Sequence, residues 1–489
     1  MAKKHGVFIY EEGTALTVPQ VSESGLQVVI GTAPINTADD PASLVNVPIL
    51  ANSASEAMEA LGYSTDFEKY TLCQTMYVTA NIYQVSPVVY INVLDPDRHK
   101  KTLPETEIIV EDMQAVAKIN GILRKGLTVK YQNESEWITA VLGTDYTVAF
   151  NSDGYLVITL ISDRPIASAT NIKVSGNQID PTAVTKNDII GAVDVSTGKE
   201  TGMEVIRQVY PKLGVVPGIL IAPGWSHEPE VGIALSAKAA NINGVFKCIA
   251  VLDLPCDRTN GAIKYTDVKT IKERCGYTSE FSYVLWPKVM VGDLIFPYSV
   301  VAAARIAYED ASHEDVPSRS PSNKTLAITG TCLEDGTEVT LDQDQGTTVN
   351  DYGVATAINI NGFRLWGNYT GCYPSSSDAK DLWLSVRRMF NWQGNTFILT
   401  YFDRVDDPMD FRLVENVVDS ENIRCAGYAP EHWAGANIEY LESDNSATDI
   451  LAGHITFRQH IAPYTPAETI DNILNYDINM LQAALTGGE

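Results

Sequence analysis

The chain has 489 residues, of which 45% are apolar and 20% charged, and its formal net charge is −26. This balance is typical of a globular chain of about three domains, and so acidic a surface would repel a phosphate backbone. No basic run is longer than His99–Lys101. No apolar run approaches the about 18 residues of a membrane-spanning helix, and no signal peptide opens the chain. We therefore expect no direct nucleic-acid or membrane partner, and a chain that folds in the cytoplasm.

Residues 4–10, KHGVFIY, form a short β-prone run that Glu11-Glu12-Gly13 separates from the next predicted strand. Such a run near a terminus has two interpretations. It pairs as an edge strand within its own domain, or it is an arm that joins the sheet of another subunit. The local pattern alone slightly favours the first.

Alternating strand and helix patterns then predict an open α/β core. The run PGILIAPG at 217–224 is unbroken and apolar and lies between turn residues, which is typical of a strand buried on both faces of a parallel sheet. With the helix predicted at 229–241 and the strand at 246–254, it makes a βαβ crossover. The other elements predicted for this core are strands at 27–31, 88–93 and 281–286 and helices at 53–61, 67–83, 202–210, 267–275 and 297–309.

Residues 98–191 have a different pattern. Strand-like runs occur at 126–131, 136–141 and 155–161, the last after the hairpin turn Asp153-Gly154, and helical periodicity resumes only beyond residue 191. We interpret 98–191 as an all-β domain inserted into the α/β core, which then comprises 26–97 and 192–345.

Residues 352–366 predict a β-hairpin. Asn361-Gly362 lies between two alternating runs, and this dipeptide suits a two-residue turn that needs positive φ at both positions. A loop of that length places Ile360 opposite Phe363 and Ile358 opposite Leu365, with all four side chains on one face of the sheet.

An amphipathic helix is predicted directly after the hairpin, from about residue 378 to Gly394. We expect a further strand at 392–403, a helix at 413–429 and a long last strand at 450–461. Hairpin and helix together predict a C-terminal α+β domain over 346–465, after which residues 466–489 leave the fold. The predicted fold class is thus a multi-domain chain with α/β and α+β parts.

Motifs for catalysis, cofactors and metals are all incomplete. The loop after the strand at 217–224 has one glycine and a bulky Trp225 where a dinucleotide phosphate would lie. Glu200 replaces the Ser or Thr that a phosphate loop needs after Lys199, and Val231 stands where a zinc-protease motif starting at His227 needs its second histidine. We therefore predict no enzyme activity and no catalytic, metal or cofactor-binding residues.

The seven cysteines are scattered and form no CxxC pair. Reduced structural thiols are the simplest interpretation for a chain made in the cytoplasm. Cys372 and Cys425 lie in loop-like surroundings, so cross-links between subunits in an oxidising medium are the alternative.

Several stretches, in order from 217 to 470, resemble the contractile tail sheath proteins of bacteriophages and the related sheaths of phage-tail-like bacteriocins. The buried strand 217–224 is the first of them. The Trp-Gly-Arg-Thr usual in the family after the hairpin is Trp366-Gly367-Asn368-Tyr369 here. The remaining matching residues are Pro297-Tyr298-Ser299, Ala303, Arg305, Ser320-Pro321-Ser322-Asn323, Asn359–Gly362, Arg364-Leu365-Trp366-Gly367, Trp383, Arg387-Arg388, Gly427, Gly453 and Pro463, with Pro466-Ala467-Glu468.

The resemblance implies a structural, non-enzymatic subunit of a virion tail. Such subunits ring a tail tube in hexameric layers that stack helically, and the polymer contracts to drive the tube through a bacterial envelope and deliver the genome. The implied partners are further copies of the chain, the tail tube protein, and the baseplate and tail terminator proteins, with assembly in the host cytoplasm and no cofactor.

The same resemblance implies roles for particular segments. In the family the terminal arms, here residues 1–25 and 466–489, add strands to neighbouring subunits, which favours the arm interpretation of residues 4–10 over the edge strand. The resemblance also implies that the insertion at 98–191 points outward. The implied residues are Val7, Phe8, Ile9 and Tyr10 of the N-terminal arm, Ile470, Ile473, Leu474 and Ile478 of the C-terminal arm, an acceptor hairpin of Ile358, Ile360, Asn361, Gly362, Phe363 and Leu365, and a tube-facing helix at 378–391 with Asp378, Lys380, Asp381, Arg387 and Arg388.

Two other classes of function stay open at this point. An α/β core is compatible with an enzyme whose active site has diverged, although neither a phosphate loop nor a nucleophile is recognisable. The predicted β insertion is compatible with a binding module on a virion or cell surface.

Overall fold

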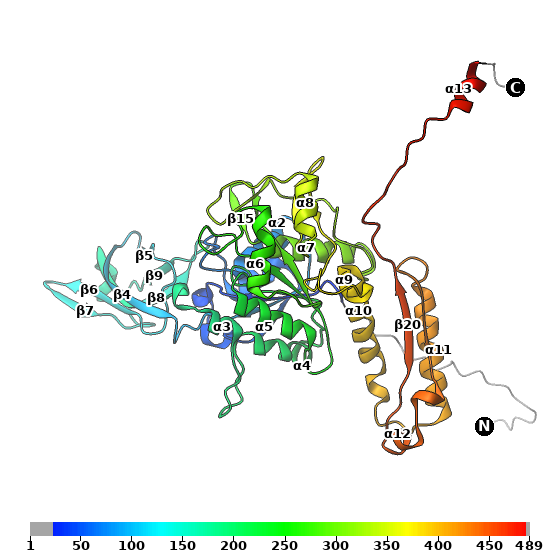
Figure 1. Cartoon of the computed structure of the whole chain (residues 1–489). Coiled ribbons are helices and arrows are strands. Elements are labelled where there is room, and N and C mark those ends of the chain that lie inside the picture. The colour runs from blue at the N-terminus through cyan, green and yellow to red at the C-terminus, as the bar shows by residue number, and fades with distance from the viewer. Residues whose placement is uncertain (1–22, 486–489) are drawn as a thin grey trace, which may run out of the picture.

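The computed structural model describes residues 23–485. It is an elongated molecule with an α/β body in the middle, a group of β-strands at one end and a helical module at the other (Figure 1). The predicted mixture of α/β and β-rich parts is confirmed, since several separate sheets alternate with thirteen α-helices among the described residues.

A six-stranded sheet forms the centre of the body. Every neighbouring pair is parallel except β2 with β3. In spatial order its strands are β13 (Ser282–Leu285), β12 (Ile249–Asp253), β11 (Ile219–Ile221), β1 (Gln27–Gly31), β3 (Val88–Asn92) and β2 (Pro48–Ala51).

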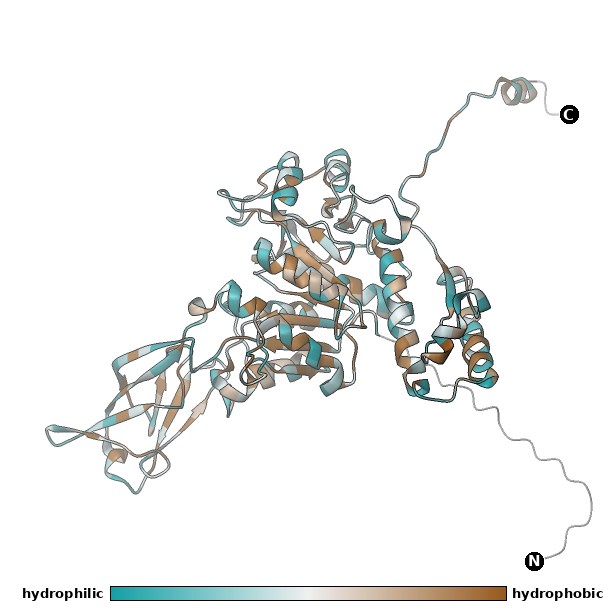
Figure 2. Cartoon of the chain, turned by 60° about the horizontal axis from the view of Figure 1, so that its bottom comes forward, coloured by the Kyte–Doolittle hydropathy of each residue, from teal (hydrophilic) through white to brown (hydrophobic). Residues whose placement is uncertain are grey.

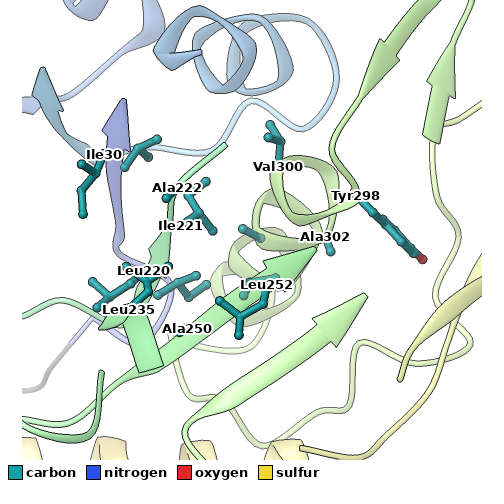
Figure 3. Close-up of a cluster of buried hydrophobic side chains, with 14 of the residues drawn as sticks. Ile30, Leu220, Ile221, Ala222, Leu235, Ala250, Leu252, Tyr298, Val300 and Ala302 are labelled. Atoms are coloured by element: carbon teal, nitrogen blue, oxygen red, sulfur yellow. The ribbon is translucent and has the colours of Figure 1, made fainter. Parts of the chain in front are cut away.

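Helices pack around this sheet, so the central strands have no solvent-facing side. All residues of β1, β3, β11, β12 and β13 are buried, as an unbroken apolar run predicts. Figure 3 shows Leu220 and Ile221 of β11 between Leu235 and Val300, which come from two helices. The helices of the body are α1 (Ala54–Leu61), α2 (Leu72–Asn81), α3 (Lys186–Ile190), α4 (Val209–Leu213), α5 (Pro229–Ala240), α6 (Val268–Cys275), α7 (Tyr298–Ala311) and α8 (Gln343–Asn350).

A small antiparallel sheet lies beside the body and consists of β15 (Leu294–Phe296), β14 (Lys288–Val291) and β16 (Gly330–Cys332). The next strand pair, β17 (Thr356–Asn359) and β18 (Phe363–Trp366), attaches to the main sheet. Its lead-in residue Ala355 exchanges backbone hydrogen bonds with Val284 and Trp286. The predicted hairpin therefore belongs to the main core, which also contains the buried Ile358 and Leu365.

Seven strands from the middle of the chain pair only with one another. Two antiparallel sheets enclose a separate apolar core that includes Val129, Ile158 and Ile172. One sheet has the order β4 (Lys100–Ile109), β10 (Asn171–Ile179), β6 (Thr128–Asn133), β7 (Glu136–Thr139), and the other β5 (Gln114–Ala117), β9 (Leu156–Leu160), β8 (Tyr146–Phe150).

The C-terminal module (residues 379–463), which we call the ribbon module, differs most from the prediction. The strand expected at 392–403 is wrong, because α10 (Leu384–Tyr401) runs through Gly394 without a break. The long last strand is also partly wrong: Ser446 caps a short helix, α12 (Ala447–Leu451), by accepting a hydrogen bond from the Asp449 amide. The module's other elements are α9 (Ala379–Leu382), α11 (Phe411–Gly427), β19 (Trp433–Glu439) and β20 (Arg458–Pro463). One more helix, α13 (Ile478–Leu485), lies beyond the module.

Figure 2 shows hydrophobic strands at the centre of the body. Leu220 is fully buried in β11, so Leu220→Ala leaves a cavity and lowers the free energy of unfolding by about 2–5 kcal/mol. Chemical denaturation followed by tryptophan fluorescence measures this. The control Val195→Ala, at a side chain that is 98% exposed, should change it by less than about 0.5 kcal/mol. Equal effects of the two substitutions would contradict the central position of β11.

Candidate assembly interface

The ribbon module presents a two-stranded antiparallel sheet, β19 with β20. Within residues 23–485 neither strand pairs with any third strand. One face of the ribbon packs on helices α10 and α11 through Trp433, Ile438 and Ile461. A sheet of two strands is marginal by itself, and its unpaired backbone groups are a template for a further strand.

The two edges of this ribbon are not equivalent. Asn422 of α11 donates to the carbonyl of Ile438 and accepts from its amide, at 3.0 and 2.9 Å. Ile438 therefore directs its backbone N–H and C=O groups away from β20. Gln459, which lies opposite Ile438 in the ladder, directs its own N–H and C=O groups away from β19. By this alternation Gln459 and Ile461 present their N–H and C=O groups along the outer edge of β20. The edge of β19 is partly closed by α11, whereas that of β20 is open.

A buried polar network holds β20 against the helices. The Glu421 carboxylate of α11 is fully buried and accepts hydrogen bonds from Gln393 of α10 at 2.6 Å and from Gln459 of β20 at 2.8 Å. Arg424 adds an ion pair to the same carboxylate and donates to Gln393. Burial alone raises the pKa of Glu421, but the Arg424 guanidinium and the two amides outweigh it and hold the pKa below its ordinary value of 4.5.

Ser24, where the described N-terminal segment enters the fold, is held by a buried ion pair. Arg388 of α10 donates to Asp310 of α7 at 3.0 Å and to the backbone oxygen of Ser24 at 3.1 Å. The Ser24 hydroxyl donates to the other Asp310 oxygen at 2.8 Å. Gly218 leaves room for this contact, since a Cβ there would lie 2.0 Å from the Ser24 oxygen. Loss of either charge would leave the other buried without a partner, at a cost of about 3–5 kcal/mol.

The C-terminal segment leaves the fold directly after β20. Tyr464 donates to the Pro430 carbonyl at 2.9 Å, and Glu468 accepts hydrogen bonds from Tyr369 and from Asn368. Tyr369 is held in place by stacking on Tyr373 and Trp383. A groove of about 780 Å³ lies between this root of the arm and the body.

Beyond Glu468 the chain extends away from the body (Figures 1 and 2). Residues 470–477 have no regular structure, and α13 follows them. Ile470, Ile473, Leu474 and Tyr476 are each at least 80% exposed. A contiguous run of this kind marks an interaction segment. Ile478, predicted as part of an arm strand, lies in α13.

The predicted acceptor hairpin has another register than expected, and one of its two outer edges is occupied. Asn359 pairs with Phe363, so the loop holds three residues, Ile360, Asn361 and Gly362. Ile358 therefore lies opposite Arg364 and not Leu365, which corrects the predicted register. The outer edge of β18 is already used, because the backbones of Asn323, Lys324 and Leu326 bond to it.

The predicted tube-facing helix is two helices, α9 and α10, with Trp383 in an extended conformation between them. Asp378 caps α9 and is exposed, and Lys380 and Asp381 are partly exposed. Arg387 and Arg388 were expected on the same surface but are buried, at 7% and 3% exposure. Arg387 pairs with Asp381 at 3.0 Å and Arg388 with Asp310, so neither arginine is available to a tube.

All seven cysteines are free and buried. Cys372 and Cys425 were expected in loops, yet Cys425 lies within α11 and is fully buried, and burial raises its pKa to about 11. The N-terminal strand predicted at Val7, Phe8, Ile9 and Tyr10 lies outside the described residues.

The carboxyl ends of the parallel strands, where α/β enzymes place their ligands, hold a buried structural cluster. Asp253 accepts hydrogen bonds from the Ser299 amide and the Ser226 hydroxyl, both at 2.8 Å. It thereby caps the first turn of α7. Burial raises the pKa of Asp253.

The curated proteins that match this chain in sequence are named as tail sheath proteins. No family model matches the chain. It is 29% identical over 431 residues to the tail sheath protein of Burkholderia phage BcepMu, a match that covers 86% of this chain and 85% of that protein. It is 26% identical over 306 residues to the tail sheath protein of Escherichia phage P2, with 59% of this chain and 70% of that protein covered.

Two solved structures share the fold over 98% of this chain and all of theirs. One is the PVC sheath complex of an extracellular contractile injection system in its contracted state, with a TM-score of 0.57 and 12% identity. The other is the contracted helical sheath of the anti-feeding prophage, with a TM-score of 0.56 and 13% identity.

An open strand edge and an unburied apolar arm are features typical of a subunit of a larger assembly. The chain is similar in sequence to tail sheath proteins, as the resemblance of its motifs predicts. Its function is that of a subunit of a contractile sheath, and the enzyme and binding-module alternatives are not supported. In the described part of the chain no helix is both long and apolar enough to cross a bilayer.

The ribbon module should loosen in acid because of Glu421. A carboxylate with a lowered pKa stabilises the fold above its ordinary pKa of 4.5, and this contribution disappears as the pH falls through the lower folded value. Between pH 7 and pH 3 the melting temperature should fall more steeply for the natural chain than for Glu421→Gln. Scanning calorimetry measures both, and Glu415→Gln, at an exposed position of the same helix, is the control. Parallel curves for all three proteins would contradict this role of Glu421.

Proposed function

We propose that the C-terminal arm of one subunit adds a strand to the open edge of β20 in a neighbouring subunit. The observation that carries the proposal is the pairing of two unsatisfied features in one chain. Gln459 and Ile461 direct backbone groups to an unpaired edge, and residues 470–476 expose apolar side chains without any sheet of their own. Strand addition satisfies both.

This replaces the hairpin at 358–365 as the acceptor, because the edge of β18 is occupied within the chain. The N-terminal arm, residues 1–25, would extend the same ribbon from a second neighbour along the Trp433–Ala436 half of β19, where Asn422 does not close the edge. Main-chain hydrogen bonds of this kind survive rigid-body movement of the bodies that they join.

Heterologous contacts that do not close produce a helical polymer. We propose hexameric rings stacked helically around a tail tube, with baseplate and tail terminator proteins at the two ends, assembled in the host cytoplasm into the virion. Within a subunit, residues 26–97 and 192–345 act as the core domain, on which α3 and the hairpin of β17 and β18 also pack. The β-rich domain at 98–191 points outward, and residues 346–465 face inward.

Within the predicted tube-facing segment, 378–391, Asp378 and Lys380 at the start of α9 are accessible and would contact the tube. The buried Arg387 and Arg388 serve the interior of the subunit. Contraction is driven by burial between subunits: about 400 Å² of additional apolar contact per subunit corresponds to roughly 10 kcal/mol before the costs of ordering. No nucleotide hydrolysis is required on this account.

Lysines at the apolar positions of the arm should abolish assembly and leave the subunit folded. Ile473 and Leu474 are each more than 80% exposed, so Ile473→Lys with Leu474→Lys keeps the melting temperature of the isolated chain. Successive side chains of a strand point to opposite faces, so one of the two would pack on the helices of the neighbour's ribbon module. Its lost burial corresponds to about 1.5–3 kcal/mol per joint, which is over tenfold in association. Negative-stain microscopy should show long cylinders for the natural chain and none for this variant.

The matched control is Asn472→Lys with Asn475→Lys, which adds the same charge at the flanking polar positions. It should still form cylinders. Normal cylinders from the Ile473/Leu474 variant would show that the arm is not the joint, and loss of assembly in both variants would assign the defect to charge.

A further inference from the structure

Three side chains from two distant parts of the chain meet where the ribbon module joins the body. Glu314 lies in the loop after α7, and Glu431 and His432 lie between α11 and β19. One oxygen of each carboxylate and one ring nitrogen of His432 all lie within 4.8 Å of one another. This is the one group of three such ligands in the part of the chain that the structure describes.

His432 is the residue that distinguishes this group from an ordinary acidic patch. The residue is only 2% exposed, yet its Nε2 has no hydrogen-bond partner within residues 23–485. Its distance to the nearest Glu314 oxygen is 3.9 Å, which is too long for a hydrogen bond. A buried polar nitrogen without a partner is unfavourable by itself, so its position beside two carboxylates calls for a ligand.

The other ring nitrogen is already held. Nδ1 of His432 lies 2.9 Å from the Ser318 hydroxyl. When Nδ1–H donates to Ser318, the lone pair of Nε2 faces the two carboxylates. A metal-binding histidine commonly has this arrangement, in which a polar partner on the far nitrogen fixes the tautomer and the ring orientation.

We propose that Glu314, Glu431 and His432 bind a divalent transition-metal ion of the zinc type. One imidazole nitrogen and two carboxylate oxygens leave a fourth position for water. An ion bound at about 2 Å brings its ligands to roughly 3.3 Å from one another, closer than they lie here. Both glutamates are exposed, so their side chains can rotate inward while the buried histidine stays in place.

Such an ion would join the two parts of the subunit near the roots of both arms. The backbone oxygen of Asp315, next to Glu314, lies 2.7 Å from the Ser24 hydroxyl at the N-terminal root. The backbone oxygen of Pro430, next to Glu431, accepts a hydrogen bond from Tyr464 at the C-terminal root. The ion would therefore restrict movement between the loop after α7 and the loop before β19, whether or not the arms exchange strands.

Calorimetric titration of the full-length, chelator-treated protein with Zn²⁺ tests the proposal. One ion per chain should bind, and Glu314→Gln should weaken binding by at least about tenfold. The Glu314 side chain is 73% exposed, so this variant keeps the fold. The matched control Glu415→Gln, at another exposed glutamate, should bind zinc as the natural chain does.

Mg²⁺ provides a second measurement, since an imidazole ligand favours zinc over this hard ion. Thermal unfolding should shift upward with Zn²⁺ and not with Mg²⁺, and both Glu431→Gln and Glu314→Gln should remove the shift. Absence of saturable zinc binding would overturn the proposal. So would equal affinity in the natural chain and in the two glutamate variants.

Discussion

The open edge of β20 is the constraint on which this structure depends. A strand that leaves N–H and C=O groups unpaired must find water or another strand, and here the alternation set by Asn422 and Ile438 directs the groups of Gln459 and Ile461 outward. The same chain carries apolar residues after Glu468 that nothing in the described subunit covers. The subunit is thus incomplete alone, as the repeating unit of a sheath has to be.

The connections to this edge are rigid. Glu421 fastens β20 to two helices, and the Arg388–Asp310 pair fastens one of those helices to the body and to Ser24. Under the proposed strand addition, a pull on an arm would be transmitted through these contacts to the body. Both ion pairs are buried, so removal of one partner would leave an uncompensated charge inside the subunit.

Much of the body could be predicted from the sequence, because strands such as 217–224 are unbroken apolar runs between turn residues. The ribbon module could not. Gly394 predicts a helix end, but the tertiary burial of Trp392 and Thr396 keeps α10 continuous. The hairpin register was missed because Asn361-Gly362 also fits a three-residue loop. Arg388 looked like a surface residue since its partner, Asp310, lies far away in the chain. Glu314 and His432 are likewise brought together only by the fold, and no local motif marks them.

A cryo-electron microscopy map of the assembled polymer tests the central claim most directly, since it traces every arm to the subunit that receives it. The account predicts that residues 470–476 of one subunit run as a strand beside Gln459 and Ile461 of another. A map in which this arm folds back onto its own body, or in which the edge of β20 faces solvent, would contradict it.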